Sequence, residues 1–445
     1  MFLEGWIQER MGGCSDIREY KLARLKETLD YVVQESPFYK HLFAASGVSP
    51  DDLRGLNDLA LLPFTTAEDL KRQPYKVPCM SLSRVKRVFS LYTGGTSGAP
   101  KLVFFAEADL DRIADYMGAA MKSVAISASI AGEGFRAYII LPNGKPESQQ
   151  KMLEKGVRGV GAVPLLGDLA LDSAQQLERI EQVRPDIVFG PVSRVYRLSQ
   201  EGSEERDLSA LGVRVIFITS EYVPAAMRES LSQLWKAEVF THYGMTEMGW
   251  AGGIECEAHH GYHFNEADLL LEVIDPSTGV PVSAGEEGEL VLTTLNRHAM
   301  PLVRYRTGDL GRLLEGGCGC GASVLQRIGP LVKRKDSIIR LRSGEEIYPG
   351  VLDEALHRLT DLISYQCSLV EGDGKERLVS RVELIRPRAA AGVEAAEAVL
   401  GIPEIARSVQ AGLMLEPEVE VVERGGIKRA GRAKKLIADE RSCAG

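Results

Sequence analysis

The chain has 445 residues, of which 44% are hydrophobic and 26% are charged, as in an ordinary folded globular protein. This length is too great for one ordinary core and predicts two or more domains. The net charge of -9 argues against a nucleic-acid binder. No apolar stretch is long enough for a membrane span, and the first residues lack the apolar core of a signal peptide.

The first two thirds of the chain alternate between predicted helices and strands. Residues 16–47 carry apolar side chains at helical spacing, and the turn at Ser36-Pro37 ends that helix. Four apolar runs predict buried strands, at 136–142, 185–191, 213–220 and 237–244, with helices at 172–183 and 224–235 between them. This alternation predicts an α/β fold with a largely parallel, doubly wound sheet, which binds ligands where strands end.

The pattern changes after about residue 265. Residues 269–295 predict a β-rich subdomain with Pro and Gly turns, and the strand at 337–342 and a helix starting near Pro349 predict a small α+β unit. We therefore predict a large N-terminal domain, 1–334, and a small C-terminal domain, 335–445. The Ala-rich segment 386–401 predicts a surface helix.

The segment SLYTGGTSGAPK (90–101) is rich in Gly, Ser and Thr. Glycines allow the backbone to approach a ligand closely, and successive N–H groups and hydroxyls can surround a phosphate. Lys101 adds a positive charge, although the spacing is not that of a Walker loop. By composition alone, a flexible surface turn is an equally good interpretation.

Three further motifs follow in order: FTHYGMTEMG (240–249), RYRTGDLGRL (304–313) and VKRKD (332–336). Together with the Gly-rich segment they resemble the adenylate-forming superfamily of acyl-CoA synthetases and peptide-synthetase adenylation domains, over roughly residues 60–441. Within that superfamily the chain is most similar to phenylacetate–CoA ligases, on YVVQESPFYKHLF (31–43), residues 289–310 and IYPGVLDEAL (347–356).

The resemblance assigns most of an ATP site. It implies that the Gly-rich loop holds the β- and γ-phosphates through Thr93, Gly95, Thr96, Ser97, Gly98 and Lys101. It also implies that Tyr243, beside Gly244, stacks on adenine, that Thr246 contacts the α-phosphate and that Glu247 holds Mg²⁺. A carboxylate together with phosphate oxygens is a ligand set that Mg²⁺ prefers. A solvated acid at a helix start is the alternative for Glu247.

The remaining nucleotide contacts are implied in the same way. Asp309 matches the ribose-binding acid of the superfamily, although Thr-Gly-Asp is also ordinary turn chemistry. Ser220 and Glu221 lie where the superfamily places a loop against adenine, which is a weaker match. Arg334 matches the arginine before the hinge, and Lys335 or Asp336 would be the hinge about which the C-terminal domain swings.

The tail departs from the superfamily, whose last motif is Gly-Lys with a catalytic lysine. If Gly431 aligns with that glycine, Arg432 occupies the lysine position, with Lys434 two residues further on. Arginine differs from lysine in shape and hydration. Lys434 takes the role after a small register shift, or Arg432 performs it less well, or this half-reaction is impaired. A solvated basic helix is the plain alternative.

Cysteine placement predicts a metal site. Cys256 and His263 lie in one segment, and Cys318 and Cys320 form a Cys-x-Cys pair in another. Thiolate and imidazole suit tetrahedral Zn²⁺, and some phenylacetate–CoA ligase relatives resemble this pattern, so we expect a structural zinc with His259 or His260 as substitutes for His263. Four unrelated residues on two loops are the alternative. The odd count of seven cysteines favours reduced thiols in the cytoplasm, and four need no special role: Cys14, Cys79, Cys367 and Cys443.

The leading hypothesis is therefore a two-step ligase that activates a carboxylic acid, expected to be an aryl acid, with ATP and Mg²⁺ and transfers it to coenzyme A. One alternative is an enzyme that stops at the adenylate or uses a deazaflavin, an amine or a carrier protein as acceptor. Another is a catalytically impaired nucleotide-binding homologue. Regions 136–145 and 215–250 would line the acid pocket, with Tyr138, Tyr222 and Trp250 as its aromatics or as core residues. A homodimer is the default assembly.

Overall fold

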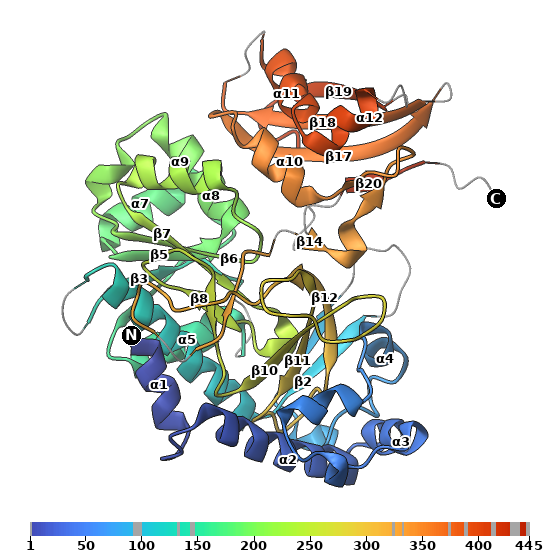
Figure 1. Ribbon diagram of the computed structural model, residues 1–445. Coiled ribbons are helices and arrows are strands. Elements are labelled where there is room, and N and C mark those ends of the chain that lie inside the picture. Colours follow the sequence, from blue (N-terminus) through green and yellow to red (C-terminus); the bar gives the residue numbers. More distant parts are fainter. Residues whose placement is uncertain are drawn as a thin grey trace. The chain divides into compact units, whose positions relative to one another are not determined.

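The computed structural model describes residues 2–91, 100–130, 134–142, 147–322, 325–331, 333–372, 375–386, 390–410, 415–427 and 437–441. The chain forms two compact units, one of residues 1–166 with 240–331 and the other of residues 167–239 with 332–445. Helices and strands alternate along the chain, as expected for the predicted α/β class (Figure 1). The predicted boundary between an N-terminal domain, 1–334, and a C-terminal domain, 335–445, stays a prediction.

Three helices open the chain: α1 (Phe2–Arg10), α2 (Ile17–Glu35) and α3 (Pro37–Ser46). The predicted break at Ser36-Pro37 is confirmed. A new helix follows directly, because the Ser36 side chain accepts a hydrogen bond from the Tyr39 backbone N–H and Pro37 occupies the first helical position. Proline is favoured there, since that position needs no N–H donor.

The four predicted strands are all present in one eight-stranded sheet. Its order is β13-β9-β8-β7-β6-β5-β3-β4. The bounds are β3 (Arg136–Ile139), β4 (Val163–Leu166), β5 (Ile187–Pro191), β6 (Val215–Thr219), β7 (Glu238–Tyr243), β8 (Gly253–Glu255), β9 (Tyr262–Phe264) and β13 (Arg327–Ile328). Strands β3 and β4 pair in parallel, as do β5 and β6. The antiparallel series of β7, β8, β9 and β13 is an extension that strand–helix alternation did not predict.

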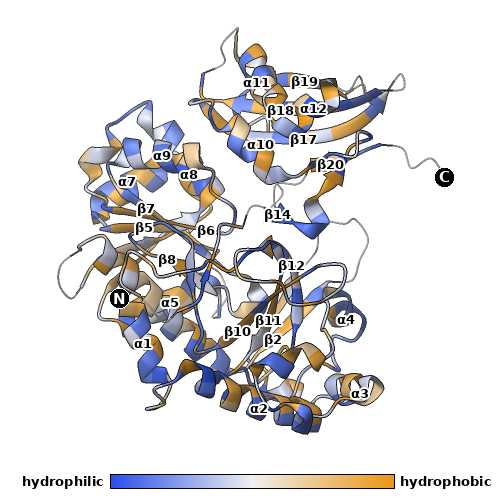
Figure 2. Cartoon of the chain, viewed as in Figure 1, coloured by the Kyte–Doolittle hydropathy of each residue, from blue (hydrophilic) through white to orange (hydrophobic). Residues whose placement is uncertain are grey.

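Helices connect these strands. They are α5 (Glu107–Ser127), α6 (Gln149–Gly159), α7 (Ser173–Val183), α8 (Val192–Ser203) and α9 (Ala225–Trp235), after the short α4 (Ala67–Arg72). In Figure 2, α7 and α9 carry both hydrophobic and hydrophilic residues, whereas β5 is largely hydrophobic. This contrast is typical of surface helices packed on a buried sheet. No helix in the described ranges is both long and apolar enough to cross a membrane.

The predicted β-rich subdomain is a set of antiparallel strands. Strands β10 (Leu269–Ile274), β11 (Gly288–Thr294) and β12 (Tyr305–Gly311) are neighbours in sequence and in space. A separate hairpin joins β1 (Arg87–Leu91) to β2 (Lys101–Phe105). Along β12 the side chains alternate between buried and half-buried, so Tyr305, Thr307 and Asp309 share the buried face.

The C-terminal part contains a four-stranded sheet in the order β19-β18-β17-β20. Its strands are β17 (Leu362–Gly372), β18 (Lys375–Leu384), β19 (Leu415–Val422) and β20 (Ile437–Asp439). The helices of this part are α10 (Pro349–Leu356), α11 (Ala391–Leu400) and α12 (Pro403–Gln410), and its short strands are β14 (Lys333–Arg334), β15 (Ile339–Arg340) and β16 (Glu346–Ile347). The predicted helix start at Pro349 is confirmed. The Ala-rich segment is a helix whose Ala391, Ala395 and Val399 lie in the core.

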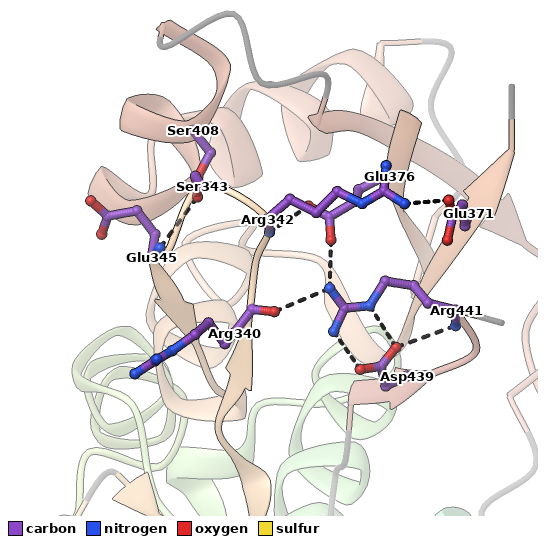
Figure 3. Close-up of polar contacts among 9 residues, drawn as sticks. All are labelled: Arg340, Arg342, Ser343, Glu345, Glu371, Glu376, Ser408, Asp439 and Arg441. Atoms are coloured by element: carbon purple, nitrogen blue, oxygen red, sulfur yellow. Dashed lines mark hydrogen bonds and ion pairs between the residues drawn. The ribbon is translucent and has the colours of Figure 1, made fainter. Parts of the chain in front are cut away.

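A polar cluster holds β20, the last strand, in place (Figure 3). The Arg441 guanidinium contacts both carboxylate oxygens of Asp439, a carboxylate oxygen of Glu376 and the Arg340 carbonyl. Glu376 is only 4% exposed and also accepts from the Arg342 backbone N–H. The hydrogen bond from Arg441 lowers the pKa of the Asp439 carboxyl below its ordinary value. The stabilisation from this contact is therefore fully present when the pH is above the ordinary pKa of aspartate. It is lost as the pH falls through the lowered pKa of Asp439.

Replacing Arg441 by Gln is expected to lower the free energy of unfolding by about 2 kcal/mol, because hydrogen bonds to charged groups are lost around a buried carboxylate. Denaturant unfolding followed by circular dichroism measures this change. Arg377→Gln is the matched control on the same sheet, since its ion pair with Glu418 is exposed on both sides and contributes less than about 1 kcal/mol. Equal losses in both variants would contradict the prediction.

Candidate active site

Two hydrogen bonds join β12 to the end of β7 and the segment that follows it. The Tyr243 hydroxyl donates to Asp309 Oδ2 at 2.8 Å, and the Tyr305 hydroxyl donates to Glu247 Oε1 at 3.1 Å. Tyr305 and Asp309 are four residues apart on one strand face, and Tyr243 and Glu247 are four residues apart along the partner segment. The predicted Tyr-Gly-Met-Thr-Glu and Thr-Gly-Asp motifs therefore meet at one place in the fold.

Lys101 joins the same cluster from the start of β2. Its ammonium group forms an ion pair with Glu247 and donates to the Tyr305 hydroxyl at 3.0 Å. Lys101 is 7% exposed and Glu247 is 2% exposed, so this is a buried pair. The other residues of the Gly-rich loop that are predicted to bind phosphate lie outside the described residues: Thr93, Gly95, Thr96, Ser97 and Gly98.

The loop after β7 is a tight turn, and this turn fixes the backbone positions of Thr246 and Glu247. Thr246 begins the short 3-10 helix η5 (Thr246–Met248), and the Trp250 backbone N–H donates to the Met245 carbonyl at 2.9 Å. A Cβ on Gly244 would lie 1.8 Å from the Trp250 carbonyl oxygen, so only glycine fits there. The glycine of this motif thus has a steric role beside the predicted nucleotide contact.

Tyr305 is a member of this cluster that the sequence reasoning did not single out. It lies inside the quoted motif RYRTGD, and its side chain is 1% exposed. Period-two alternation along a strand places residue 305 on the same face as residue 309. Its place four residues before Asp309 in the same motif is the signal that could have identified Tyr305.

The other predicted nucleotide contacts are described only within the second unit. Ser220 and Glu221 follow β6, where Ser220 has a φ of 87°, a strained value for a residue other than glycine. Arg334 ends β14 and pairs with Asp336 at 3.2 Å. Their roles stay predictions. The two candidates for the tail lysine, Arg432 and Lys434, lie outside the described residues.

The aromatic residues expected near the acid have clear packing partners. Trp250 packs on Phe89 and Phe105, with ring centroids 5.0 and 5.6 Å apart. Tyr138 on β3 is fully buried, and the Tyr222 hydroxyl contacts the Glu354 carboxylate. Core packing accounts for the positions of Trp250 and Tyr138, and a hydrogen bond accounts for that of Tyr222. The contact of these three residues with an acid stays a prediction.

Four predicted metal ligands converge elsewhere in the first unit. The ligand atoms of Cys256, His263, Cys318 and Cys320 all lie within 4.8 Å of one another. The sulfur atoms of Cys256 and Cys318 are 3.5 Å apart, and Cys320 Sγ lies 3.3 Å from His263 Nε2. Thiolates bound about 2.3 Å from one tetrahedral zinc are separated by roughly 3.8 Å, which is close to this spacing. The donor set and its geometry fit a structural zinc.

The histidine in this cluster is His263, and neither substitute joins it among the described residues. His259 faces Glu255 at 3.6 Å, and His260 lies beside Arg327. Burial lowers the pKa of His263 to about 4, so its imidazole is neutral near pH 7, the form that binds metals. A Cβ on Gly261 would lie 2.4 Å from the Ile328 carbonyl oxygen, so the turn that delivers His263 requires glycine.

Comparison with protein-family models decides the family. A model described as "AMP-binding enzyme" matches residues 31–296, more than half of the chain, and one described as "AMP-binding enzyme C-terminal domain" matches residues 344–441. The chain belongs to the AMP-binding enzyme family. This membership confirms the resemblance that the sequence motifs indicated for this AMP-binding enzyme.

Individual proteins agree with this membership. The chain is 30% identical to a phenylacetate-coenzyme A ligase of Aromatoleum evansii, with 95% of this chain and 94% of the relative covered. It is 29% identical to the corresponding ligase of Thermus thermophilus, with 83% and 82% covered. A solved structure of 2-hydroxyisobutyryl-CoA ligase, in the postadenylation state with 2-HIB-AMP, superposes with a TM-score of 0.80 at 22% identity, covering 95% of this chain and 89% of that chain. The predicted fold is thus confirmed.

Proposed function

We propose that this AMP-binding enzyme is an AMP-forming acid–CoA ligase whose acid is an aryl acid. A carboxylate oxygen of the acid attacks the α-phosphorus of ATP, and pyrophosphate leaves. The thiol sulfur of coenzyme A then attacks the acyl carbon, AMP leaves and the thiol proton is released. Full-length similarity to phenylacetate–CoA ligases supports both steps.

The buried cluster of Lys101, Glu247, Tyr243 and Asp309 is the observation that carries this proposal. It gathers one cation, two carboxylates and an aromatic ring in a single unit. In the proposed complex, Asp309 accepts hydrogen bonds from the ribose hydroxyls and Lys101 contacts the phosphates. Glu247 would hold a Mg²⁺ ion, which neutralises charge on the leaving pyrophosphate. The enzyme then works mainly by positioning and by charge stabilisation.

Several finer assignments belong to the same proposal. Thr246 contacts the α-phosphate, and the Gly-rich loop contacts the β- and γ-phosphates. The tail supplies the adenylation cation through Lys434 or Arg432, and the segment after Arg334 is the hinge. A zinc ion held by the four-ligand cluster is structural. Cytoplasmic location, a homodimer and the lack of a nucleic-acid or membrane partner complete the proposal.

An acid-dependent pyrophosphate-exchange assay tests the function. Purified protein is incubated with ATP, Mg²⁺ and labelled pyrophosphate, and a panel of aryl and short aliphatic acids is screened with and without coenzyme A. The ligase proposal predicts exchange with at least one aryl acid, and thioester with AMP only when coenzyme A is added. Exchange without thioester would indicate a different acceptor. ATP binding without exchange on any acid would indicate an impaired homologue.

A further inference from the structure

The Tyr305 hydroxyl occupies a position between the two charged groups of the site. It accepts from Lys101 Nζ at 3.0 Å and donates to Glu247 Oε1 at 3.1 Å. Lys101 and Glu247 also pair directly, so the three groups form a closed triangle. All three residues are at most 7% exposed. A hydroxyl can satisfy both neighbours at once because it donates one hydrogen bond and accepts others.

This triangle has to open when nucleotide binds in the proposed reaction. Lys101 would turn to the phosphates, and Glu247 would exchange that ammonium group for a divalent cation. A buried carboxylate that loses a directly paired cation is strongly destabilised unless other donors hold it. The Tyr305 hydroxyl is placed to remain bonded to Oε1 of Glu247 during this exchange and to leave Oε2 free for the metal.

The backbone of Tyr305 is fixed independently of its hydroxyl. Its strand pairs with β11, where Tyr305 lies opposite Leu292, and with residue Thr65 on the other side. The neighbouring Arg306 backbone N–H donates to the Thr65 carbonyl at 2.9 Å. Because the backbone has its own supports, removing only the oxygen atom would leave the fold in place.

We propose that Tyr305 is a positioning residue, which holds the Glu247 carboxylate while this side chain exchanges Lys101 for Mg²⁺ and so sets the metal affinity of the nucleotide site. The inference rests on the proposed function, since it takes Glu247 as the metal ligand. Tyr305 touches neither substrate nor metal in this scheme. It acts only through Glu247 and Lys101.

The test compares Tyr305→Phe with Tyr39→Phe. Tyr39 is fully buried, lies in the same unit, and its hydroxyl also makes two hydrogen bonds, to the Thr65 hydroxyl and from the Val303 backbone N–H. Both variants therefore lose a bonded, buried hydroxyl at similar cost in stability. Only Tyr305→Phe removes a contact to the Lys101–Glu247 pair.

Two readouts are measured against Mg²⁺ concentration. The first is acid-dependent pyrophosphate exchange, and the second is calorimetric binding of a non-hydrolysable ATP analogue, which needs no turnover. For Tyr305→Phe we expect the Mg²⁺ concentration at half-maximal effect to rise about tenfold in both, as for the loss of one hydrogen bond to a charged group. The KM for the acid should stay unchanged, and Tyr39→Phe should match the wild type.

Other outcomes separate the two levels of the proposal. An unchanged Mg²⁺ dependence in Tyr305→Phe, with only a lower melting temperature, would overturn the positioning role and leave Tyr305 structural. The same shift in Tyr39→Phe would overturn it too, because it would reflect general destabilisation. Absence of exchange in the wild-type protein on every acid would defeat the proposed function, while calorimetry would still decide the role of Tyr305.

Discussion

Replacement of Glu247 by Gln is expected to reduce acid-dependent pyrophosphate exchange by about 1,000-fold. The change keeps the size of the side chain but removes the carboxylate charge that faces Lys101 and would hold Mg²⁺. Deleting one group that stabilises developing charge typically costs ~100- to 1,000-fold in kcat, and this position is buried, where such interactions are stronger. The initial rate of exchange at saturating ATP and acid measures the effect.

The matched control for Glu247→Gln is Glu266→Gln. Glu266 is 1% exposed, lies in the same unit and pairs with a buried lysine, Lys21. Losing this pair should destabilise the protein without changing the exchange rate of the folded fraction. A Glu247→Gln variant whose exchange stays within tenfold of wild type would rule out Glu247 as the metal-binding carboxylate of the reaction.

Replacement of Cys320 by Ser is expected to release one zinc ion per chain and to lower the free energy of unfolding by about 3 kcal/mol or more. Structural zinc sites bind with apparent free energies of roughly 10 kcal/mol or more, so losing one of four ligands removes a large part of that stabilisation. Elemental analysis of the purified protein measures zinc content. Thermal unfolding, with and without a chelator, measures the stability that depends on it.

The chain offers controls for the metal site. Cys14→Ser changes a cysteine of similar exposure outside the cluster, and it should leave zinc content and stability unchanged. His263→Ala should lose zinc, whereas His260→Ala should retain it, because only His263 lies among the three sulfur atoms. Wild-type protein purified without zinc, and with the same melting temperature in a chelator, would contradict the prediction.

Much of the fold could be predicted because its signals are local. The apolar runs that became β5, β6 and β7 needed only composition and length, and Pro349 marked a helix start by its fixed φ angle. The antiparallel extension of β8 and β9 was missed because each strand has three residues, too few for a periodic pattern. The core face of α11 was missed because alanines at a spacing of four residues are equally common on surface helices.

The candidate site also has features that the sequence could predict and features that it could not. The motifs identified Lys101, Glu247, Tyr243 and Asp309 individually, through residue types and their order along the chain. Their pairing was not predictable, since the ion pair joins residues 101 and 247 and the hydrogen bond joins residues 243 and 309. The resemblance already preferred His263 to His259 and His260, and the coordinates place His263 among the cysteine sulfur atoms.

The amino-acid sequence by itself determined the family of this protein, its α/β class and the residue types available for phosphate, metal and ribose. The tertiary structure alone decided that Tyr305 links Lys101 to Glu247, that Gly244 is sterically required and that one histidine faces three cysteines. Local periodicity and turn chemistry act over a few residues. Contacts between residues far apart in sequence, such as Tyr305 with Lys101 or His263 with Cys320, depend on how the sheets pack, which no short pattern encodes.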